Sequence, residues 1–144
     1  MIKSRIISSL EKCFPYSSII AARELKNITA LKNERLNIQL AVVESDSLRP
    51  QRIWAKPEIE GELAKYASIR TVEYVPVNLP MYNDRHDSNY ISTEPGIYPD
   101  ILQNLHNSGC MPIIAGQLKC LWIEFNFNQG VPSREYPTKI VLYS

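Results

Sequence analysis

Residues 35–44 read RLNIQLAVVE, and their pattern decides which fold class the sequence favours. Every second position is apolar, at Leu36, Ile38, Leu40 and Val42. Successive side chains of a β-strand point to opposite faces, so a period of two predicts a strand with one buried face. Residues 118–127, LKCLWIEFNF, repeat this alternation and predict a second strand, in which Trp122 faces away from Leu121 and Ile123.

Three more stretches have the β-branched and aromatic composition of strands, at residues 51–59, 67–77 and 136–144. Pro57 predicts that the first of these lies at a sheet edge or ends there, because proline cannot donate to a strand ladder. Residues 2–14 leave two interpretations open. Their isoleucines favour an extended chain, but a period of four also fits a helix striped by Ile2, Ile6, Leu10 and Phe14.

Several short strands joined by turn-rich segments, without a long helical pattern, predict an all-β protein. The expected architecture is an antiparallel, immunoglobulin-like β-sandwich. Residues 78–110 contain Pro80, Pro95 and Pro99 together with turn formers, and they predict a long proline-rich irregular loop. A chain of 144 residues has the size of one domain, so we expect residues 1–144 to form a single sandwich.

Composition narrows the classes of partner. The formal net charge is +1, which gives no reason to expect a nucleic acid or an anionic membrane surface. No apolar run approaches the length of a membrane span, and the first residues do not resemble a signal peptide. The odd number of cysteines, Cys13, Cys110 and Cys120, predicts small buried hydrophobes in a reduced, cytoplasmic protein rather than a disulfide framework or a metal site.

Five stretches carry a family resemblance, in the order SSLEKCFP, ALKNERLNIQLAV, VEYVPVNLP, NYISTEPGIYPDIL and LWIEF. Together they resemble the N-terminal β-sandwich domain of glycoside hydrolase family 123-like proteins, including uncharacterised relatives. The resemblance extends from about Ser8 to Leu142. Its most specific part is residues 87–102, where the family's loop motif matches Asp87, Tyr90, the Glu94-Pro95-Gly96 turn and the Tyr98-Pro99-Asp100 step.

The resemblance implies a two-part protein, in which an N-terminal sandwich precedes a catalytic (β/α)-barrel. The family's mechanism is substrate-assisted, with an adjacent Asp-Glu pair acting on an N-acetylated sugar. This chain contains no Asp-Glu dipeptide and ends where the barrel would begin. We therefore expect a noncatalytic accessory domain without a cofactor, whose partner is the C-terminal catalytic barrel of the same protein.

The segment NYISTEPGIYPDIL, residues 89–102, is expected to form a compact, proline-stiffened loop at one end of the sandwich. In the longer protein it would pack on the barrel or help to wall its active-site cleft. The residues expected to make contacts with the barrel or with a glycan are Tyr90, Glu94, Tyr98, Asp100 and Trp122. Asp100 could instead cap a short helical turn, and Glu94 could hold a backbone turn.

Other chemistry is possible in the same loop but less favoured. The carboxylates Asp84, Asp87, Glu94 and Asp100 would need a defined separation to act as a glycosidase pair, which the sequence does not supply. Residues 83–89, NDRHDSN, contain potential metal ligands but lack the glycine and the terminal glutamate of a calcium loop, so we predict no metal.

Two alternative functions remain open. A free-standing carbohydrate-binding module would stack sugars on aromatic rings, for which the candidates are Trp54, Tyr82, Tyr90, Tyr98 and Trp122. A domain for protein–protein interaction would fit the versatility of β-sandwiches. Exposed aromatics would favour the first alternative, whereas a large exposed apolar patch would favour contact with another domain or protein.

Overall fold

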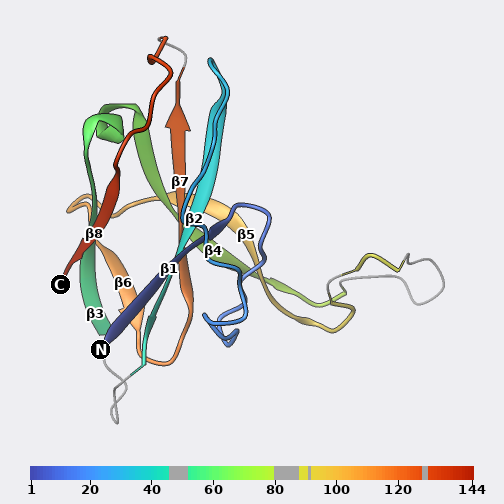
Figure 1. Ribbon diagram of the computed structural model, residues 1–144. Helices are drawn as coiled ribbons and strands as arrows, with labels where there is room; N and C mark the ends of the chain where they lie inside the picture. The colour runs from blue at the N-terminus through green and yellow to red at the C-terminus, as the bar shows by residue number, and fades with distance from the viewer. Residues whose placement is uncertain (46–51, 80–87, 91, 128–129) are drawn as a thin grey trace.

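The computed structural model describes residues 1–45, 52–79, 88–90, 92–127 and 130–144 (Figure 1). In this part of the chain, strands alternate with turns and one short 3-10 helix. The elements are β1 (Ile2–Ser8), β2 (Arg35–Glu44), β3 (Arg52–Glu60), η1 (Glu62–Tyr66), β4 (Ala67–Val77), β5 (Gly96–Asn104), β6 (Met111–Ile114), β7 (Lys119–Asn126) and β8 (Lys139–Tyr143). The predicted all-β class is confirmed.

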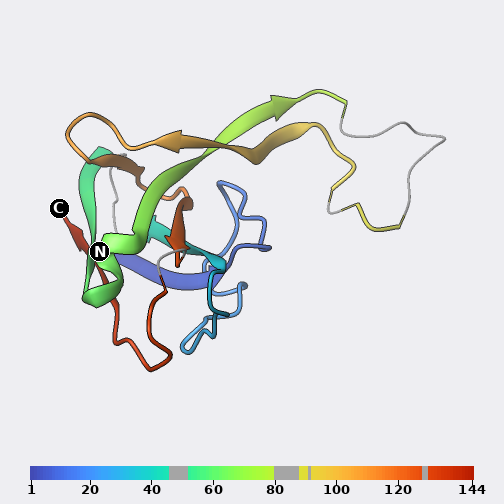
Figure 2. The ribbon, with the colours of Figure 1, turned by 90° about the horizontal axis from the view of Figure 1, so that it is seen from above.

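The strands form two antiparallel sheets. A five-stranded sheet has the order β1-β2-β7-β4-β5, and a three-stranded sheet has the order β6-β3-β8. Figure 2 shows the two sheets from above, with β3 and β8 of the three-stranded sheet on one side and the five-stranded sheet beside them. The arrangement confirms the predicted antiparallel sandwich.

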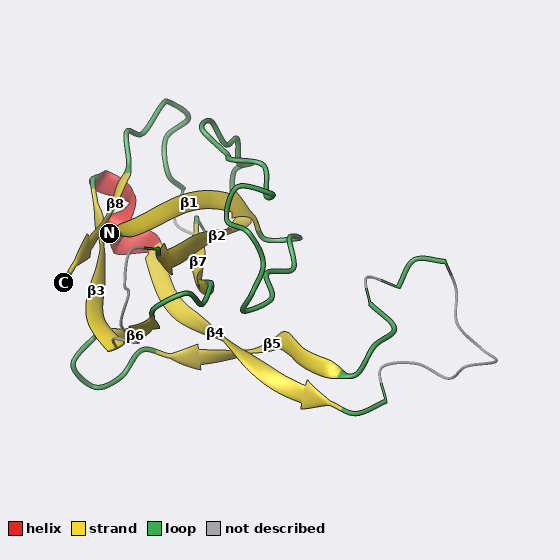
Figure 3. Cartoon of the chain, turned by 90° about the horizontal axis from the view of Figure 1, so that it is seen from below, coloured by secondary structure: helices red, strands yellow, loops and turns green. Residues whose placement is uncertain are grey.

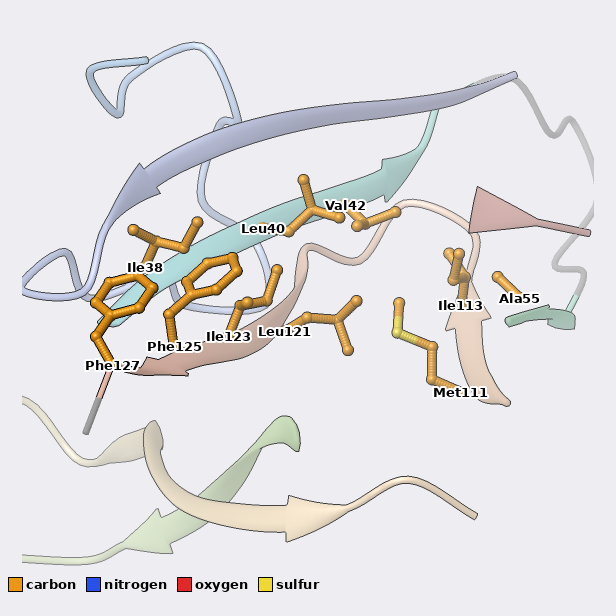
Figure 4. Close-up of a cluster of buried hydrophobic side chains, with 10 residues drawn as sticks. All are labelled: Ile38, Leu40, Val42, Ala55, Met111, Ile113, Leu121, Ile123, Phe125 and Phe127. Atoms are coloured by element: carbon orange, nitrogen blue, oxygen red, sulfur yellow. The ribbon is translucent and has the colours of Figure 1, made fainter. Parts of the chain in front are cut away.

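The main core lies between the sheets and is built by the two strands that the alternation predicted. β2 and β7 are neighbours in register, with Ile38 opposite Ile123 and Leu40 opposite Leu121. Figure 4 shows their apolar side chains meeting those of the second sheet. The buried members of this cluster are Ile38, Leu40, Val42, Ala55, Met111, Ile113, Leu121, Ile123, Phe125 and Phe127.

A second, smaller core covers the opposite face of the five-stranded sheet. Residues 9–34, all of which the structure describes, form no strand or helix, and we call them the covering segment because their Cys13, Ile19 and Ala22 pack on this face. Buried here are Ile7, Cys13, Ala41, Val72, Leu118 and Cys120. The sheet is therefore covered on both sides, although the alternation of its strands predicted one buried face.

Two ambiguous stretches are resolved by strand pairing. Residues 2–8 form β1, which pairs with β2, so the extended interpretation is right and the helical one is wrong. Pro57 lies inside β3 opposite Leu142 of β8. β3 is the middle strand of its sheet and continues to Glu60, so the predicted sheet edge or strand end at Pro57 is wrong. Pro57 is accommodated because β6 pairs only with residues 52–55, so among the described strands Pro57 has a partner on one side alone.

The predicted irregular segment at residues 78–110 is too long. Residues 96–104 form β5, which pairs along β4 as the edge strand of the larger sheet. Pairing to β4 supplies the backbone hydrogen bonds, and Pro99 is tolerated because an edge strand has a free side. Asp100 therefore lies in a strand, and its predicted role as the cap of a helical turn is wrong.

Candidate functional site

The strands β4 and β5 continue beyond the rest of their sheet and form a projecting arm. β4 pairs with β7 only as far as Val72, opposite Cys120. Its pairing with β5 continues to Val77, opposite Gly96. We define the arm as residues 73–79, 88–90 and 92–101; Figure 3 shows how far it extends from the sandwich. The predicted loop segment NYISTEPGIYPDIL belongs mostly to this arm.

A β-bulge interrupts the arm at Asp100. Glu73 pairs with Ile101 and Tyr74 pairs with Pro99, so Asp100 is an extra residue without a register partner. A bulge bends and twists the strand that carries it. Pro99, beside the bulge, has no backbone N–H. The middle of this outer edge is consequently a poor template for another strand.

Tyr98 fixes the turn that leads into β5. Its hydroxyl lies 2.9 Å from the hydroxyl oxygen of Ser92 and also contacts the carbonyl oxygen of Glu94. The N–H of Glu94 donates to the same Ser92 hydroxyl over 3.3 Å. The Tyr98 ring meets Phe14 of the covering segment edge to face, with centroids 5.4 Å apart. Tyr98 thus ties the turn to the body of the domain.

The root of the arm is held by polar contacts with the first residue of β7 and the residue before it. Lys119 forms an ion pair with Glu73 over 2.5 Å, and the Lys119 side chain is only 13% exposed. The Tyr74 hydroxyl donates to the Leu118 carbonyl oxygen over 2.7 Å. Burial raises the pKa of Tyr74 above its ordinary value. These contacts set the direction in which the arm leaves the sheet.

The arm exposes large apolar side chains along its length. Ile97 and Ile101 of β5 are 50% and 52% exposed, and Leu79 and Tyr90 are exposed as well. Leu102, next to Ile101, is also exposed, and the register with β4 places Ile97 and Leu102 on one face and Ile101 on the other, so apolar side chains lie on both faces of β5. The ionisable groups among the described residues of the arm are Glu73, Tyr74, Tyr90, Glu94, Tyr98 and Asp100, so this surface combines apolar and acidic character.

The structure brings together four of the five residues expected to make contacts. Tyr90, Glu94, Tyr98 and Asp100 all belong to the arm; the first, second and fourth are exposed and Tyr98 is half-buried. Trp122 does not belong to the arm. It lies on β7 and faces away from Leu121 and Ile123, as predicted, but Ile19 and Ala22 of the covering segment pack in the same cluster.

No metal cluster or catalytic pair emerges from the described part of the chain. Within it, no three histidine, cysteine or acidic side chains are grouped as a metal site would require. Asp84, His86 and Asp87 of the predicted metal alternative, and Tyr82 among the candidate aromatics, lie outside the described residues. Glu94 and Asp100 are exposed carboxylates at the surface of the arm.

An aromatic surface lies on the outer side of the smaller sheet. Trp54 is 46% exposed, and its neighbour Ala55 points into the core. The Arg52 guanidinium lies 4.7 Å from the Trp54 ring centroid, and the His106 ring lies 5.9 Å from it. Tyr143 is also exposed and is the register partner of Lys56, two residues beyond Trp54.

Sequence reasoning missed one pair of neighbouring thiols. The Cys13 and Cys120 thiols are buried in the same apolar cluster, and each perturbs the pKa of the other. They are far apart in the sequence, and Cys13 belongs to a segment without strand periodicity. The only relevant feature of the sequence was the odd number of cysteines, and an odd number predicts no disulfide framework.

Comparison with known proteins relates the fold to a glycosidase. No protein-family model matches the sequence, and no curated protein matches it either. The structure is similar to that of a family 123 glycoside hydrolase from Clostridium perfringens, studied for glycolipid glycan hydrolysis, with a TM-score of 0.67 and 17% identity. The match covers 99% of this chain and 24% of the glycosidase chain.

This similarity shows a shared fold, and it confirms the predicted resemblance at that level. The chain spans about a quarter of the length of the glycosidase chain that it matches. In the part of the chain that the structure describes, no helix is both long and apolar enough to cross a membrane.

Proposed function

We propose that the chain is a noncatalytic accessory domain of a glycoside-hydrolase-like protein, and that its arm packs against a neighbouring catalytic barrel. The observation that carries this proposal is the arm. A monomeric domain gains nothing from holding isoleucines in water, and exposed apolar surface of this kind is typical of contact sites. The edge residues Ile97 and Ile101 would be buried by the neighbouring domain.

The chemistry of the arm indicates what kind of surface it would meet. The exposed Glu94 and Asp100 lie beside the apolar side chains. A complementary partner surface would have an apolar centre with lysine or arginine at its rim. The bulge at Asp100 and the missing N–H of Pro99 disfavour the addition of a strand, so the contact would be made by side chains.

Two further points support the proposal. The fold of nearly the whole chain corresponds to about a quarter of a glycosidase chain, which leaves most of that protein for other parts. The chain also lacks the adjacent Asp-Glu pair that the family resemblance assigns to catalysis. The barrel would thus carry out catalysis, and the sandwich would position the barrel or complete its active-site cleft. The proposed location is the cytoplasm.

The test compares cysteine labelling in the 1–144 chain and in the protein expressed from its full reading frame. Cys110 is first replaced by serine, and Ile101→Cys then reports on the arm. A matched control, Leu31→Cys, reports on an exposed position of the covering segment. We expect the maleimide labelling rate at position 101 to fall at least about tenfold in the longer protein, with an unchanged rate at position 31. Equal rates at position 101 would refute the docking of the arm.

One observation favours a second candidate, a carbohydrate-binding module. Trp54 and Tyr143 are exposed on one face of the smaller sheet, where Arg52 and His106 provide hydrogen-bond donors. Pyranose rings pack on such aromatic faces. Titration with N-acetylated oligosaccharides should then quench tryptophan fluorescence, and Trp54→Ala should abolish the change while Trp122→Phe retains it. Absence of binding to any glycan on an array would exclude this candidate.

A further inference from the structure

The covering segment, residues 9–34, is pinned to the five-stranded sheet on both sides of Cys13. Before Cys13, the buried amide of Gln39 donates to the carbonyl oxygens of Ser8, Ser9 and Glu11 over 3.1, 3.2 and 2.9 Å. After Cys13, the N–H of Leu118 donates to the carbonyl oxygen of Pro15 over 2.7 Å. The backbone around Cys13 is therefore fixed at its near neighbours in both directions.

The hydrogen bond between Leu118 and Pro15 also places Cys13 near Cys120. Pro15 lies two residues after Cys13, and Leu118 lies two residues before Cys120, so the hydrogen bond between them aligns the two cysteines. Cys120 lies in the middle of the sheet, opposite Ala41 of β2 and Val72 of β4. Both thiols are buried, at 6% and 1% exposure, and both belong to the cluster beneath the segment.

The pKa values of the two thiols shift in opposite directions. The interaction with Cys120 lowers the pKa of Cys13, whereas the interaction with Cys13, together with burial, raises the pKa of Cys120. Cys13 lies in the irregular covering segment, whereas Cys120 lies in β7, in the middle of the five-stranded sheet. Cys13 is thus the better first nucleophile when the segment opens.

We propose that Cys13 and Cys120 are a disulfide-forming pair that fastens the covering segment to β7. The oxidant is a small-molecule disulfide. The Cys13 thiolate attacks one of its sulfurs and releases one thiol; Cys120 then attacks the Cys13 sulfur of the mixed disulfide and releases the second thiol. The two protein thiols lose two hydrogens in total, and the oxidant becomes two thiols. This proposal does not depend on the function proposed for the arm.

The consequence is a switch in how firmly the segment is attached. In a reducing compartment the pair stays as two thiols, and hydrogen bonds with apolar contacts hold the segment. In an oxidising compartment the bond closes a loop that spans most of the chain, which restricts the unfolded state. Tyr98 rests on Phe14, directly after Cys13, so the same attachment would steady the root of the arm.

The test refolds the chain from guanidinium chloride in a buffer of oxidised and reduced glutathione, with a second sample kept in reductant. Trypsin places the three cysteines in separate peptides, residues 13–23, 86–119 and 120–134. We expect a linked peptide joining 13–23 to 120–134, and a rise in Tm on the order of 10 °C that reductant reverses.

Variants distinguish the pair from chance oxidation. Cys110→Ser should keep both the linked peptide and the rise in Tm, whereas Cys13→Ala and Cys120→Ala should each abolish the rise. The wild-type peptide map shows which cysteines are linked even where a variant folds poorly. Linkage through Cys110, glutathione adducts without a protein disulfide, or a linked form whose Tm equals that of the reduced chain would each overturn the proposal.

Discussion

Single buried polar side chains determine how the irregular part of this protein is attached. Gln39 is 4% exposed, and its side-chain amide donates hydrogen bonds to three carbonyl oxygens of residues 8–11. In the sequence, Gln39 occupies the polar phase of the alternation in residues 35–44, which predicts a solvent-facing side chain. It is buried because residues 9–34 cover that face, and their irregular backbone has no periodicity from which this cover could be predicted.

Removing this amide should loosen the covering segment. Gln39→Ala removes the donor to the carbonyl oxygens of Ser9 and Glu11, while that of Ser8 still accepts from the Glu11 N–H, and an unsatisfied buried group costs about 1–3 kcal/mol. We expect the free energy of unfolding, measured by urea denaturation, to fall by that amount. Gln103→Ala on the exposed edge strand is the matched control and should change it by less than about 0.5 kcal/mol. Equal losses in the two variants would contradict this account.

The free energy of unfolding should fall at alkaline pH because of Tyr74. Burial raises its pKa in the folded state, so the folded state retains a proton that the unfolded state has lost. Its contribution is fully present below its unfolded pKa of about 10 and is lost as the pH rises above that value. Between about pH 9 and 11, we expect wild type to lose stability more steeply than Tyr74→Phe. Tyr16→Phe, at an exposed position, should follow wild type; parallel curves for all three proteins would disprove the effect.

At the scale of elements, the sequence predicted the strands whose side chains alternate most clearly. The alternate apolar positions of residues 36–42 and 121–127 face one core, as their period of two required. β5 was missed because Pro95, Gly96 and Pro99 are turn formers, and because the pairing that makes it a strand comes from β4, far along the chain. Local propensity could not supply that long-range partner.

The outer edge of β5 is protected by the same features that hid it from prediction. Pro99 removes a donor, and the extra residue Asp100 breaks the ladder. Replacing Pro99 with threonine and deleting Asp100 should produce a regular edge lined by Ile97 and Ile101. We expect this variant to dimerise or aggregate at concentrations where wild type keeps a constant mass, as measured by sedimentation velocity. The single change Pro99→Thr, which retains the bulge, should have a weaker effect; unchanged mass in both variants would argue against edge protection.

At the scale of the whole molecule, the sandwich and the arm have different roles. The sandwich has a buried core on each face of its larger sheet. The arm has contacts at its root and at Tyr98, and it exposes apolar residues beyond them. Sequence similarity placed four of the five candidate residues within residues 89–102, but it did not predict that the covering segment would partly bury the fifth, Trp122.

This division predicts that the arm can be changed without loss of folding. In the 1–144 chain, replacing both Ile97 and Ile101 with threonine keeps the β-branched shape and removes exposed apolar surface, so the free energy of unfolding should change by less than about 0.5 kcal/mol per site. Ile123→Ala, at a fully buried position, should cost about 2–5 kcal/mol.

The same pair of arm substitutions should act differently in the protein expressed from its full reading frame. There, loss of apolar contact with the barrel should lower the temperature at which the two parts unfold together, or should separate one calorimetric transition into two. The isolated domain serves as the control, since its transition should not move. If the longer protein unfolds identically with and without the substitutions, the arm does not couple the sandwich to its neighbour. Its exposed isoleucines would then have to serve a partner outside this polypeptide.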